Sequence, residues 1–551
     1  MVNNHTLKLI SLGGIGDVTK NMYIYEYADS QIAVDCGIGF PKETALGVDV
    51  VIPDISYLEK SGKKLLGIIL THGHQDHIGG LPYILPRLPQ TPVFGSILAV
   101  ALAENKVREF GLPNQFSAVK DHLSLGPFEI DFIHITHSIP DCKHLLIKTP
   151  AGTVYHGADF KFDLTPMDNL PADFNAIAKA GVSGIDVLLT DSLRVEQPGF
   201  TPSERSLLSA IDQAVRNTAG KFIFTTISSA ISRIDMAIQA AVKYNRKVAL
   251  AGRSIENNVK IAAKHGFIKI PKDALIDVRN VSHYKPHQIA IIIAGAAGQE
   301  GSAMHRLAAG EHQILSLKPK DHVVISADAI PGTESDVYSL IDTLYKQGAL
   351  VSYSGTTQGL HVSGHGYRGD LALLVRMTRP KHIVPIGGNI RHMYAYRQMV
   401  QEMAYQPNQV HLLEGGQVLS IDHQHVRTTG VVETKNVYVD GLGIGDVGSI
   451  VLRDRQVMAA DGMLLAIVPV RRDNSQVAGD VEIVSRGFVY MKESADLIEK
   501  AKKHVRTCLK NQKGIVTDWG FIRKKIERAL ERFLYEATQR RPLILCVVLE
   551  V

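Results

Sequence analysis

Residues 72–77 concentrate the most reactive side chains of this 551-residue chain. They read His-Gly-His-Gln-Asp-His and directly follow an apolar run at 65–70, which we interpret as a buried strand. The segment supplies four potential metal ligands: His72, His74, Asp76 and His77. Imidazole and carboxylate groups are ligands that zinc prefers. Surface histidines are common, but four ligands in this order at a strand end predict two neighbouring metal sites, the first held by His72 and His74.

Three further residues at expected strand ends extend this prediction. His137 follows a strand at 130–133, and Asp159 follows another at 153–156. Asp35 closes a third strand, where its carboxylate is placed to orient a ligand imidazole from behind. Taken singly, an aspartate at a strand end is more often a turn former. The prediction therefore depends on their combination with the segment at 72–77.

The elements that must position these residues follow a layered α/β pattern. The first 200 residues combine short strands and glycine-rich turns with a helix, at 8–12, 22–26, 31–35, 96–111 and 153–156. From 203 to 355, helices alternate with buried strands, at 203–218, 221–225, 231–244, 247–250 and 289–294. This alternation predicts βαβ units and a parallel sheet. Residues 360–425 return to short strands and one long helix, as if the first domain resumed.

A further α/β unit is expected from about residue 431. It contains helices at 493–511 and 518–538 and a terminal strand at 543–549. Two segments, 364–369 and 443–448, match the pattern GxGxxG, but a dinucleotide site needs a strand before it and a helix after it. Residues 449–452 look like a strand, so we expect no nucleotide cofactor.

Composition narrows the class of protein. The chain is 45% hydrophobic and 21% charged, as in ordinary globular proteins, and no apolar run approaches the about 18 residues of a membrane span. No signal peptide is visible at residues 1–5. The cysteines are far apart and form no CxxC pair, which favours a reducing cytoplasm. The net charge of +5 permits a polyanionic partner without requiring one.

Longer phrases resemble ribonuclease J, of the β-CASP branch of the metallo-β-lactamase superfamily. The matching stretches are 12–16, 47–58, 137–141, 159–163, 198–204, 361–365 and 439–448. The resemblance runs nearly end to end and implies an α/β fold: a metallo-β-lactamase αββα sandwich with an inserted β-CASP domain and a C-terminal α/β domain. The implied boundaries are 1–204 and 358–430 for the sandwich, 205–357 for the β-CASP domain, and 431–551 for the linker and C-terminal domain.

The resemblance also implies roles for individual residues. The first zinc would be held by His72, His74 and His137, and the second by Asp76, His77 and a bridging Asp159. Asp76, Asp191 and His365 would be catalytic, the last two in proton transfer or leaving-group stabilisation. Substrate contacts would come from Ser228, Ser229, Ser232, Arg233, His361, Val362, Ser363, Gly364 and His365. Manganese or magnesium could replace zinc, and calcium could bind Asp49 and Asp446, which otherwise are surface turn residues.

Three departures from the family pattern lie on the side of the second metal and the phosphate. Gly387 stands where relatives carry a ligand histidine. Ala230 and Ser232 replace the asparagine and histidine of the family's phosphate pocket, and residues 294–299 have lost polar side chains. We therefore expect a paralogue with weakened nuclease activity that works beside a more active sister chain. Alternatively, His382, His392 or a water replaces the missing ligand.

Two functions remain open on the sequence. The first is a metal-dependent ribonuclease acting in RNA processing and decay, as an endonuclease, a 5′-to-3′ exonuclease or both. The alternative is a largely non-catalytic RNA-binding or regulatory subunit. RNA, single-stranded or 5′-monophosphorylated, is the expected partner, with a homodimer, homotetramer or hetero-oligomer and no membrane. A small-molecule hydrolase would not need the inserted domain. The basic residues Arg523, Lys524, Lys525, Arg528 and Arg532 either touch RNA or form the solvated face of a helix.

Overall fold

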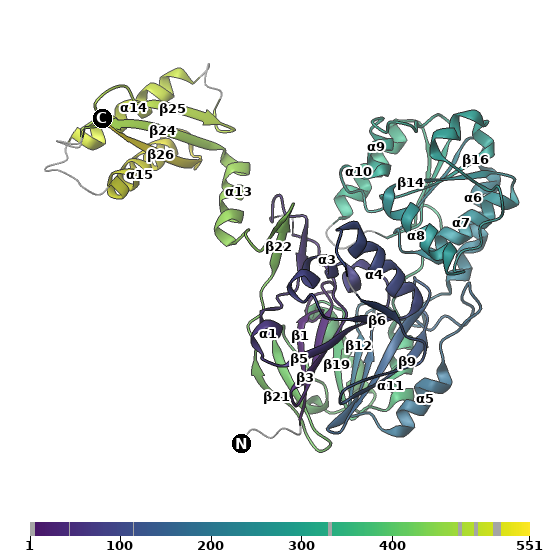
Figure 1. Ribbon diagram of the computed structural model, residues 1–551. Coiled ribbons are helices and arrows are strands. Elements are labelled where there is room, and N and C mark those ends of the chain that lie inside the picture. Colours follow the sequence, from purple (N-terminus) through teal and green to yellow (C-terminus); the bar gives the residue numbers. More distant parts are fainter. Residues whose placement is uncertain are drawn as a thin grey trace. The chain divides into compact units, whose positions relative to one another are not determined.

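The computed structural model describes residues 6–42, 44–113, 115–328, 333–471, 476–489, 494–510 and 519–551 (Figure 1). The chain forms two compact units, Met1–Phe40 with Val51–Val437 and Pro41–Val50 with Tyr438–Val551. Residues 1–5, on which the signal-peptide expectation depends, lie outside the described residues, as do the expected helix ends at 493, 511 and 518.

Two sheets pack face to face in the first unit. One runs in the order β21 (Val426–Val431), β20 (Gln417–Ile421), β1 (Leu7–Gly13), β2 (Met22–Tyr27), β3 (Ser30–Val34), β5 (Lys64–Leu70), β6 (Val93–Gly95), β7 (Phe116–Ala118). The other runs β19 (His382–Ile386), β12 (Val187–Asp191), β11 (Gly152–Gly157), β10 (Cys142–Thr149), β9 (Phe128–Ile135), β8 (His122–Leu125). Both contribute to one core, in which Tyr25 of the first sheet and Phe128 of the second are fully buried.

Helices accompany both sheets. Along the first lie α1 (Ser56–Lys60), α2 (Gln75–Ile78), α3 (Leu81–Ile84) and α4 (Ile97–Glu109), and along the second α5 (Phe174–Ser183), α11 (Arg368–Thr378) and α12 (Ile390–Glu402). Helix α4 packs on β6 and β7, whereas α11 packs on β12 and α12 on β19. The predicted αββα sandwich is confirmed. Short connecting elements are β4 (Val50–Ile52), η1 (Leu85–Arg87) and η5 (Pro407–Gln409).

Strand β5 shows why the sequence folds in this way. Its apolar run pairs in parallel with β3, where Ala33 faces Ile68 and Val34 faces Ile69. All four residues are completely buried, as expected for parallel strands covered on both faces. The polar residues therefore begin where the strand ends, at Thr71, and the ligand segment at 72–77 follows at once.

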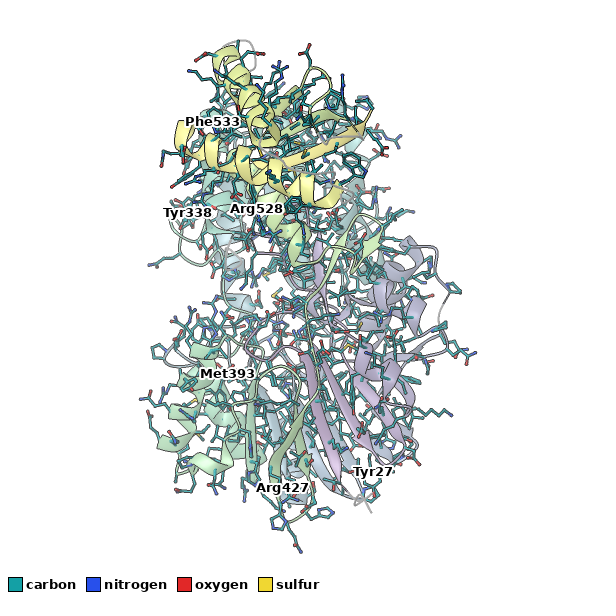
Figure 2. All side chains as sticks on the ribbon, turned by 90° about the vertical axis from the view of Figure 1, so that its left-hand side faces the viewer. Tyr27, Tyr338, Met393, Arg427, Arg528 and Phe533 are labelled. Carbon is teal, nitrogen blue, oxygen red and sulfur yellow. The ribbon has the colours of Figure 1, made fainter. Side chains whose placement is uncertain are left out.

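The opposite end of the sandwich carries no predicted site residue among the described residues. Tyr27 closes β2 there, and Arg427 lies at the start of β21; Figure 2 shows both at this end. Glu26, next to Tyr27, is 1% exposed and pairs with Lys8 and Lys63.

A parallel sheet forms the inserted α/β domain. Its order is β15 (Leu275–Ile276), β14 (Lys247–Ala251), β16 (Ile289–Ile293), β13 (Phe222–Thr225), β17 (His322–Ile325), β18 (Leu350–Ser352). Its helices are η2 (Glu204–Leu207), α6 (Leu208–Asn217), α7 (Ile231–Lys243), α8 (Arg253–Lys264), η3 (Val278–His283), η4 (Pro286–Gln288), α9 (Ala303–Ala308) and α10 (Glu334–Lys346). Every residue of β16 is buried, which explains its uninterrupted apolar sequence.

The insertion leaves and rejoins the same sheet. Strands β12 and β19 are neighbours and pair in parallel, with Asp191 opposite Ile386, although the whole parallel-sheet domain separates them in sequence. The two strand ends, Asp191 and the residue after Ile386, therefore meet at one sheet edge. The exact domain boundaries given above stay predictions.

The second unit has its own core. Strands β25 (Glu482–Arg486), β24 (Met463–Val470) and β26 (Leu543–Glu550) form a sheet in this order, covered by α14 (Ala495–Lys510) and α15 (Trp519–Thr538). Helix α15 buries Ile522, Ile526, Leu530 and Leu534, one per turn. The basic residues lie away from this stripe: Arg528 is exposed, and Figure 2 shows it on α15.

The prediction of a strand at 449–452 is wrong. Residues Ser449–Asp461 form helix α13, preceded by a hairpin of β22 (Val437–Asp440) and β23 (Gly443–Ile444). A four-residue apolar run does not by itself distinguish a strand from a helix, and here Ile450 is 64% exposed. The glycines at 443–448 thus begin in a hairpin rather than between a parallel strand and a helix, the arrangement of a dinucleotide loop.

The return segment at 360–425 contains two helices, α11 and α12, rather than one. All four cysteines lie in described positions and are free thiols. Within the described ranges, no helix combines the length and the apolar character needed to cross a bilayer.

Candidate metal centre

The predicted ligands converge at one edge of the sandwich. They occupy the segments that follow the carboxyl ends of β5, β9, β11 and β12: His72, His74, Asp76 and His77; then His137; then Asp159; and Asp191, the last residue of β12. His365 reaches the same place from the segment before α11. Since this edge gathers strand ends from both sheets, residues far apart in sequence come within contact.

The first ligand group consists of His72, His74, His137 and Asp159, whose ligand atoms all lie within 4.8 Å of one another. The Nδ1 atom of His74 lies 3.1 Å from Nε2 of His72 and 3.1 Å from Nε2 of His137. Two nitrogens bound tetrahedrally to one zinc, each about 2.0–2.1 Å from it, are about 3.3 Å apart. The side chains therefore fit a zinc ion with little movement.

Hydrogen bonds at the rear of the rings fix which nitrogen faces the ion. Nδ1 of His137 donates to the carbonyl of Gly364 at 2.6 Å, so its Nε2 presents a lone pair. Nδ1 of His72 lies 3.0 Å from the hydroxyl oxygen of Thr71, whose own hydrogen is directed to Asp35. Such partners orient ligand imidazoles and set their tautomers.

The electrostatics favour neutral imidazoles in this first group. Burial, and then the charge of His77, lowers the pKa of His74 to about 3. Burial likewise holds the pKa values of His72 and His137 well below the usual range of histidine. Because a metal binds only the neutral ring, these three side chains are ready to accept an ion without first losing a proton.

The second group shares Asp159 with the first. Nε2 of His77 lies 3.2 Å from Oδ2 of Asp159 and 3.7 Å from Oδ2 of Asp76. Nδ1 of His77 donates to Oδ2 of Asp35 at 2.7 Å, which is the position predicted for this carboxylate. Among the residues that the structure describes, this group consists of Asp76, His77 and Asp159.

Asn21 also lies at this group, although no sequence pattern indicates it. Its amide nitrogen is 3.2 Å from Nε2 of His77 and 3.3 Å from the carbonyl of Asp76. Its side-chain oxygen accepts a hydrogen bond from Tyr23. An asparagine at the start of a strand is too common a turn residue to be singled out.

Gly387 adjoins the second group. The residue follows β19 and has a φ of +62°. A Cβ atom there would lie 3.5 Å from Oδ1 of Asp159 and 3.6 Å from Oδ1 of Asp191, in ordinary contact with both. Position 387 is thus aimed at the ligands, and glycine puts nothing there.

The two histidines considered as substitutes are engaged elsewhere. His392 accepts a hydrogen bond from the amide of Asn389 at the start of α12, and His382 lies at the far end of β19, 3.1 Å from His411. In the part of the chain that the structure describes, neither joins a ligand group.

Asp191 and His365 form, together with Asp159, a third group of potential ligands at this edge. Oδ2 of Asp191 accepts a hydrogen bond of 2.8 Å from Nδ1 of His365, and Nε2 of His365 lies 4.0 Å from Asp159. Burial alone would lower the pKa of His365. The charges of Asp191 and Asp159 outweigh burial and raise this pKa to about 9. With no metal bound, the imidazole therefore carries a proton that it can donate toward the ligand groups.

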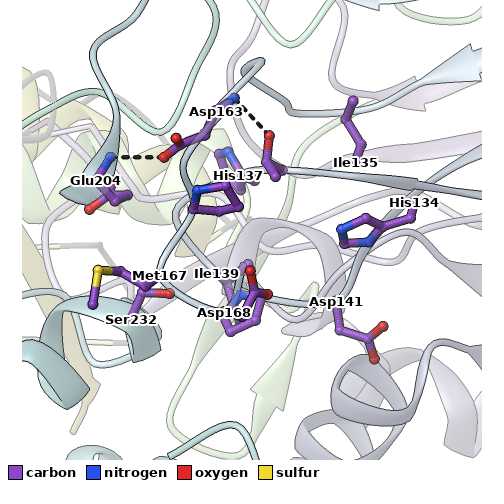
Figure 3. A pocket seen from close by; sticks show the side chains of 13 residues that line it. His134, Ile135, His137, Ile139, Asp141, Asp163, Met167, Asp168, Glu204 and Ser232 are labelled. Atoms are coloured by element: carbon purple, nitrogen blue, oxygen red, sulfur yellow. Dashed lines mark hydrogen bonds between the residues drawn. The ribbon is translucent and has the colours of Figure 1, made fainter. Parts of the chain in front are cut away.

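Of the predicted serine contacts, Ser232 shares a pocket with the predicted zinc ligand His137. The pocket is also lined by Asp141 and Glu204 (Figure 3). Ser229 is buried before α7, whereas Ser228 is half-buried and its carbonyl accepts from Asn258.

Arg233 faces into the protein. Nε and Nη2 donate to Glu204, Nη2 also donates to the carbonyl of Val362, and Nη1 donates to Ser326 and His361. These bonds occupy all five of its N–H groups, so a phosphate contact would have to displace one of them. His361 in turn lies 3.2 Å from Asp328.

The predicted calcium ligands lie in the second unit. Oδ2 of Asp49 accepts a hydrogen bond of 2.8 Å from the amide of Gly441. The carboxylate of Asp446 lies beside Gly443 in the hairpin region. Both are loop positions, and their role as ligands stays a prediction.

Family models match most of the chain. Residues 15–225 match the metallo-beta-lactamase superfamily, 219–344 the ribonuclease J beta-CASP domain, 354–412 the Zn-dependent metallo-hydrolase RNA specificity domain, and 450–551 the ribonuclease J C-terminal domain. These matches follow the sandwich, the inserted sheet, the return to the sandwich and the second unit in chain order.

Curated relatives match over the full length. Ribonuclease J2 of Bacillus subtilis is 35% identical over 100% of this chain and 99% of its own. Ribonuclease J of Thermus thermophilus is 36% identical over 99% of this chain and 95% of its own. A solved structure of a protein of unknown function from Enterococcus faecalis, 15% identical, covers 76% of this chain and 100% of its own with a TM-score of 0.54, which bears on the fold alone. The metal-ligand edge, the inserted parallel sheet and the full-length relatives agree: the chain belongs to the ribonuclease J family.

Proposed function

We propose that this chain is a metal-dependent ribonuclease that hydrolyses phosphodiester bonds of RNA in RNA processing and decay. The observation that carries the proposal is the juxtaposition of the two ligand groups, which share Asp159, with the Asp191–His365 pair at the same sheet edge. Metal ions bound there, zinc in the first group and zinc, manganese or magnesium in the second, would polarise the phosphodiester and acidify a water.

The protein's own groups supply the proton chemistry. Asp191 holds the ring of His365 by its Nδ1 atom, which leaves Nε2 directed toward the ligand groups. In this orientation His365 can donate a proton to the leaving oxygen while Asp191 stabilises the charged ring. Asp76 would act as a metal ligand at the reacting phosphate.

RNA is the proposed substrate, single-stranded or 5′-monophosphorylated. Ser232 lies in the pocket beside His137, and Ser228 and Ser229 precede the same helix, α7. Hydroxyl donors at a helix N-terminus suit a phosphate group. This chain would cleave RNA from the 5′ end, within the strand, or both. It would act in the reducing cytoplasm.

We further propose that activity is reduced because the second metal is weakly held. Three ligands remain in that group, and Gly387 offers none. The same observation favours a second candidate function, that of a largely non-catalytic RNA-binding or regulatory subunit. Such a subunit would assemble as a homodimer or homotetramer, or with a catalytic paralogue.

The test compares the wild type with His74→Ala on a 5′-monophosphorylated single-stranded RNA, in zinc, manganese or magnesium. His74 provides the nitrogen shared by the closest contacts of the first group, so its loss should abolish cleavage. Cleavage by the wild type alone supports the ribonuclease. If the wild type binds the RNA yet cuts none under any metal, the regulatory subunit is the better account.

A further inference from the structure

Four successive backbone carbonyls at 362–365 each accept a hydrogen bond from a different side chain. In chain order the donors are Arg233 at 2.5 Å, Lys161 at 3.1 Å, His137 at 2.6 Å and Thr201 at 3.0 Å. This segment carries His365 and offers the Gly364 carbonyl to a predicted zinc ligand. Its position therefore determines where both histidines point.

Two of these four donors are joined by one carboxylate. Oε1 of Glu204 lies 3.1 Å from Nζ of Lys161 and 2.8 Å from Nη2 of Arg233, and Oε2 accepts from Nε of Arg233 at 2.9 Å. Lys161 is 0% exposed, and Glu204 and Arg233 are each 2% exposed. Buried charges of this kind persist only when they are paired and hydrogen-bonded.

The members of this network come from separate parts of the first unit. Lys161 follows β11 of the sandwich, Glu204 opens η2 at the entry to the inserted domain, and Arg233 lies on α7 inside that domain. The amide of Glu204 also donates to Oδ2 of Asp163, a bond that Figure 3 shows. The network thus connects the sandwich, the inserted domain and the 361–365 segment.

We propose that Glu204 is a positioning residue for the reaction: by compensating Lys161 and Arg233 together, it fixes the 361–365 segment and so holds His365 against Asp191 and His137 toward the first ligand group. The proposal rests on the proposed ribonuclease function. Glu204 belongs to none of the ligand groups; it acts through the two cations that bind the backbone.

Removing only the charge of Glu204 should disturb this arrangement. Glu204→Gln keeps the size of the side chain but leaves two buried cations facing a neutral amide. An amide oxygen cannot compensate both, so one cation should withdraw and release the carbonyl of Val362 or Ser363. Displacement of reacting groups by an ångström can lower a rate on the order of 100-fold.

Glu26→Gln is the matched control. Glu26 is also a buried glutamate paired with two cations, Lys8 and Lys63, but it lies at the opposite end of the sandwich. The two variants therefore lose the same chemical group, although the side chains of Lys8 and Lys63 are 36% and 26% exposed, whereas Lys161 and Arg233 are buried. A general loss of stability should appear in both variants, whereas the change at 361–367 should appear in Glu204→Gln alone.

The experiment has two readouts on the full chain. Hydrogen–deuterium exchange of peptides covering 361–367 reports the segment directly and needs no activity. Single-turnover cleavage of single-stranded RNA, with metal content measured by elemental analysis, reports the chemistry. We expect Glu204→Gln to exchange faster in this segment and to cleave about 10- to 100-fold more slowly, with half-saturating RNA and metal content unchanged. Glu26→Gln should match the wild type in both.

Other outcomes overturn the proposal. Unchanged exchange at 361–367 in Glu204→Gln would show that the network does not hold the segment. Faster exchange with unchanged cleavage would deny it a role in the reaction, as would equal losses in both variants. If the wild type itself cleaves no RNA, the ribonuclease function fails, and so does the role of Glu204 in the reaction; the exchange measurement then still decides whether Glu204 orders the segment.

Discussion

At the scale of single residues, each histidine of the site has one ring nitrogen directed toward the ligand groups and a hydrogen-bond partner for the other. Asp35 illustrates this for His77. Its Oδ2 accepts from Nδ1 of His77, and its Oδ1 accepts from the amide of Thr71 at 2.8 Å. The carboxylate thus fixes both the ring and the segment that begins the ligand loop.

We predict that Asp35→Asn weakens metal binding without removing a ligand. If the amide nitrogen faces Nδ1 of His77, the ring must move its proton to Nε2 and loses the lone pair that binds the ion. Loss of such a partner typically lowers metal affinity about 10- to 100-fold. Competition with a chromophoric chelator measures the affinity.

Asp54→Asn provides the control for this variant. Asp54 is 3% exposed and accepts bonds from Ser56 at the start of α1, away from the histidines. Equal affinities in the wild type and Asp35→Asn would show that Asp35 does not tune the site.

Local sequence patterns point to the predicted ligands but not to the residues that support them. His72 and His74 follow a strand in a local pattern that the sequence displays directly. Glu204 and Arg233 are 29 positions apart and meet at the entry to the inserted domain, and no local pattern reports such a contact. Gly387 stands out only by comparison with the family pattern, because a single glycine is otherwise an ordinary turn residue.

At the scale of elements, strands predicted from apolar runs agree closely with the structure where burial is uniform. Strand β13 was expected at 221–225 and spans Phe222–Thr225. The strand predicted at 449–452 is wrong because the apolar run is short and lies on an exposed helix, α13. Hydrophobicity indicates an element's type only when the fold buries the run.

Strand β2 gives a prediction about acid stability. Burial alone would raise the pKa of Glu26, which lies on this strand. Hydrogen bonds from Lys63, Tyr57 and Lys8 outweigh burial and lower this pKa from 4.5 to about 2. Because this pKa is lower in the folded than in the unfolded protein, the ionised Glu26 stabilises the fold. The contribution is complete above about pH 4.5 and is lost as the pH falls toward 2.

Glu26→Gln should therefore be less stable than the wild type at pH 7, and the difference should shrink as the pH falls from 4.5 to 2. Urea denaturation at several pH values measures it. A difference that stays constant over this range would contradict the ion pairing of Glu26.

At the scale of the whole molecule, the two units have separate cores. Leu530 of α15 is fully buried in the core of the second unit, which also contains Leu464 and Val505. The ligand groups all lie in the first unit.

We predict that Leu530→Ala destabilises the second unit by about 2–5 kcal/mol, because it leaves a cavity, and leaves the metal content per chain unchanged. Calorimetry and elemental analysis report the two quantities. Loss of metal in this variant would mean that the ligand edge depends on the second unit.

We attribute the proposed weak binding of the second metal to position 387. Gly387→His adds an imidazole beside Asp159 and Asp191, at a left-handed φ that costs an L residue roughly 1–2 kcal/mol. Gly387→Ala brings the same strain without a ligand and is its control.

The most direct test measures the rate of RNA cleavage against manganese concentration for the wild type, Gly387→His and Gly387→Ala, each loaded with one zinc per chain. We predict that the wild type cleaves slowly and that Gly387→His reaches half its maximal rate at about tenfold lower manganese, while Gly387→Ala gains nothing. A wild type that already binds two metals tightly and cleaves at full rate without added manganese would contradict the account.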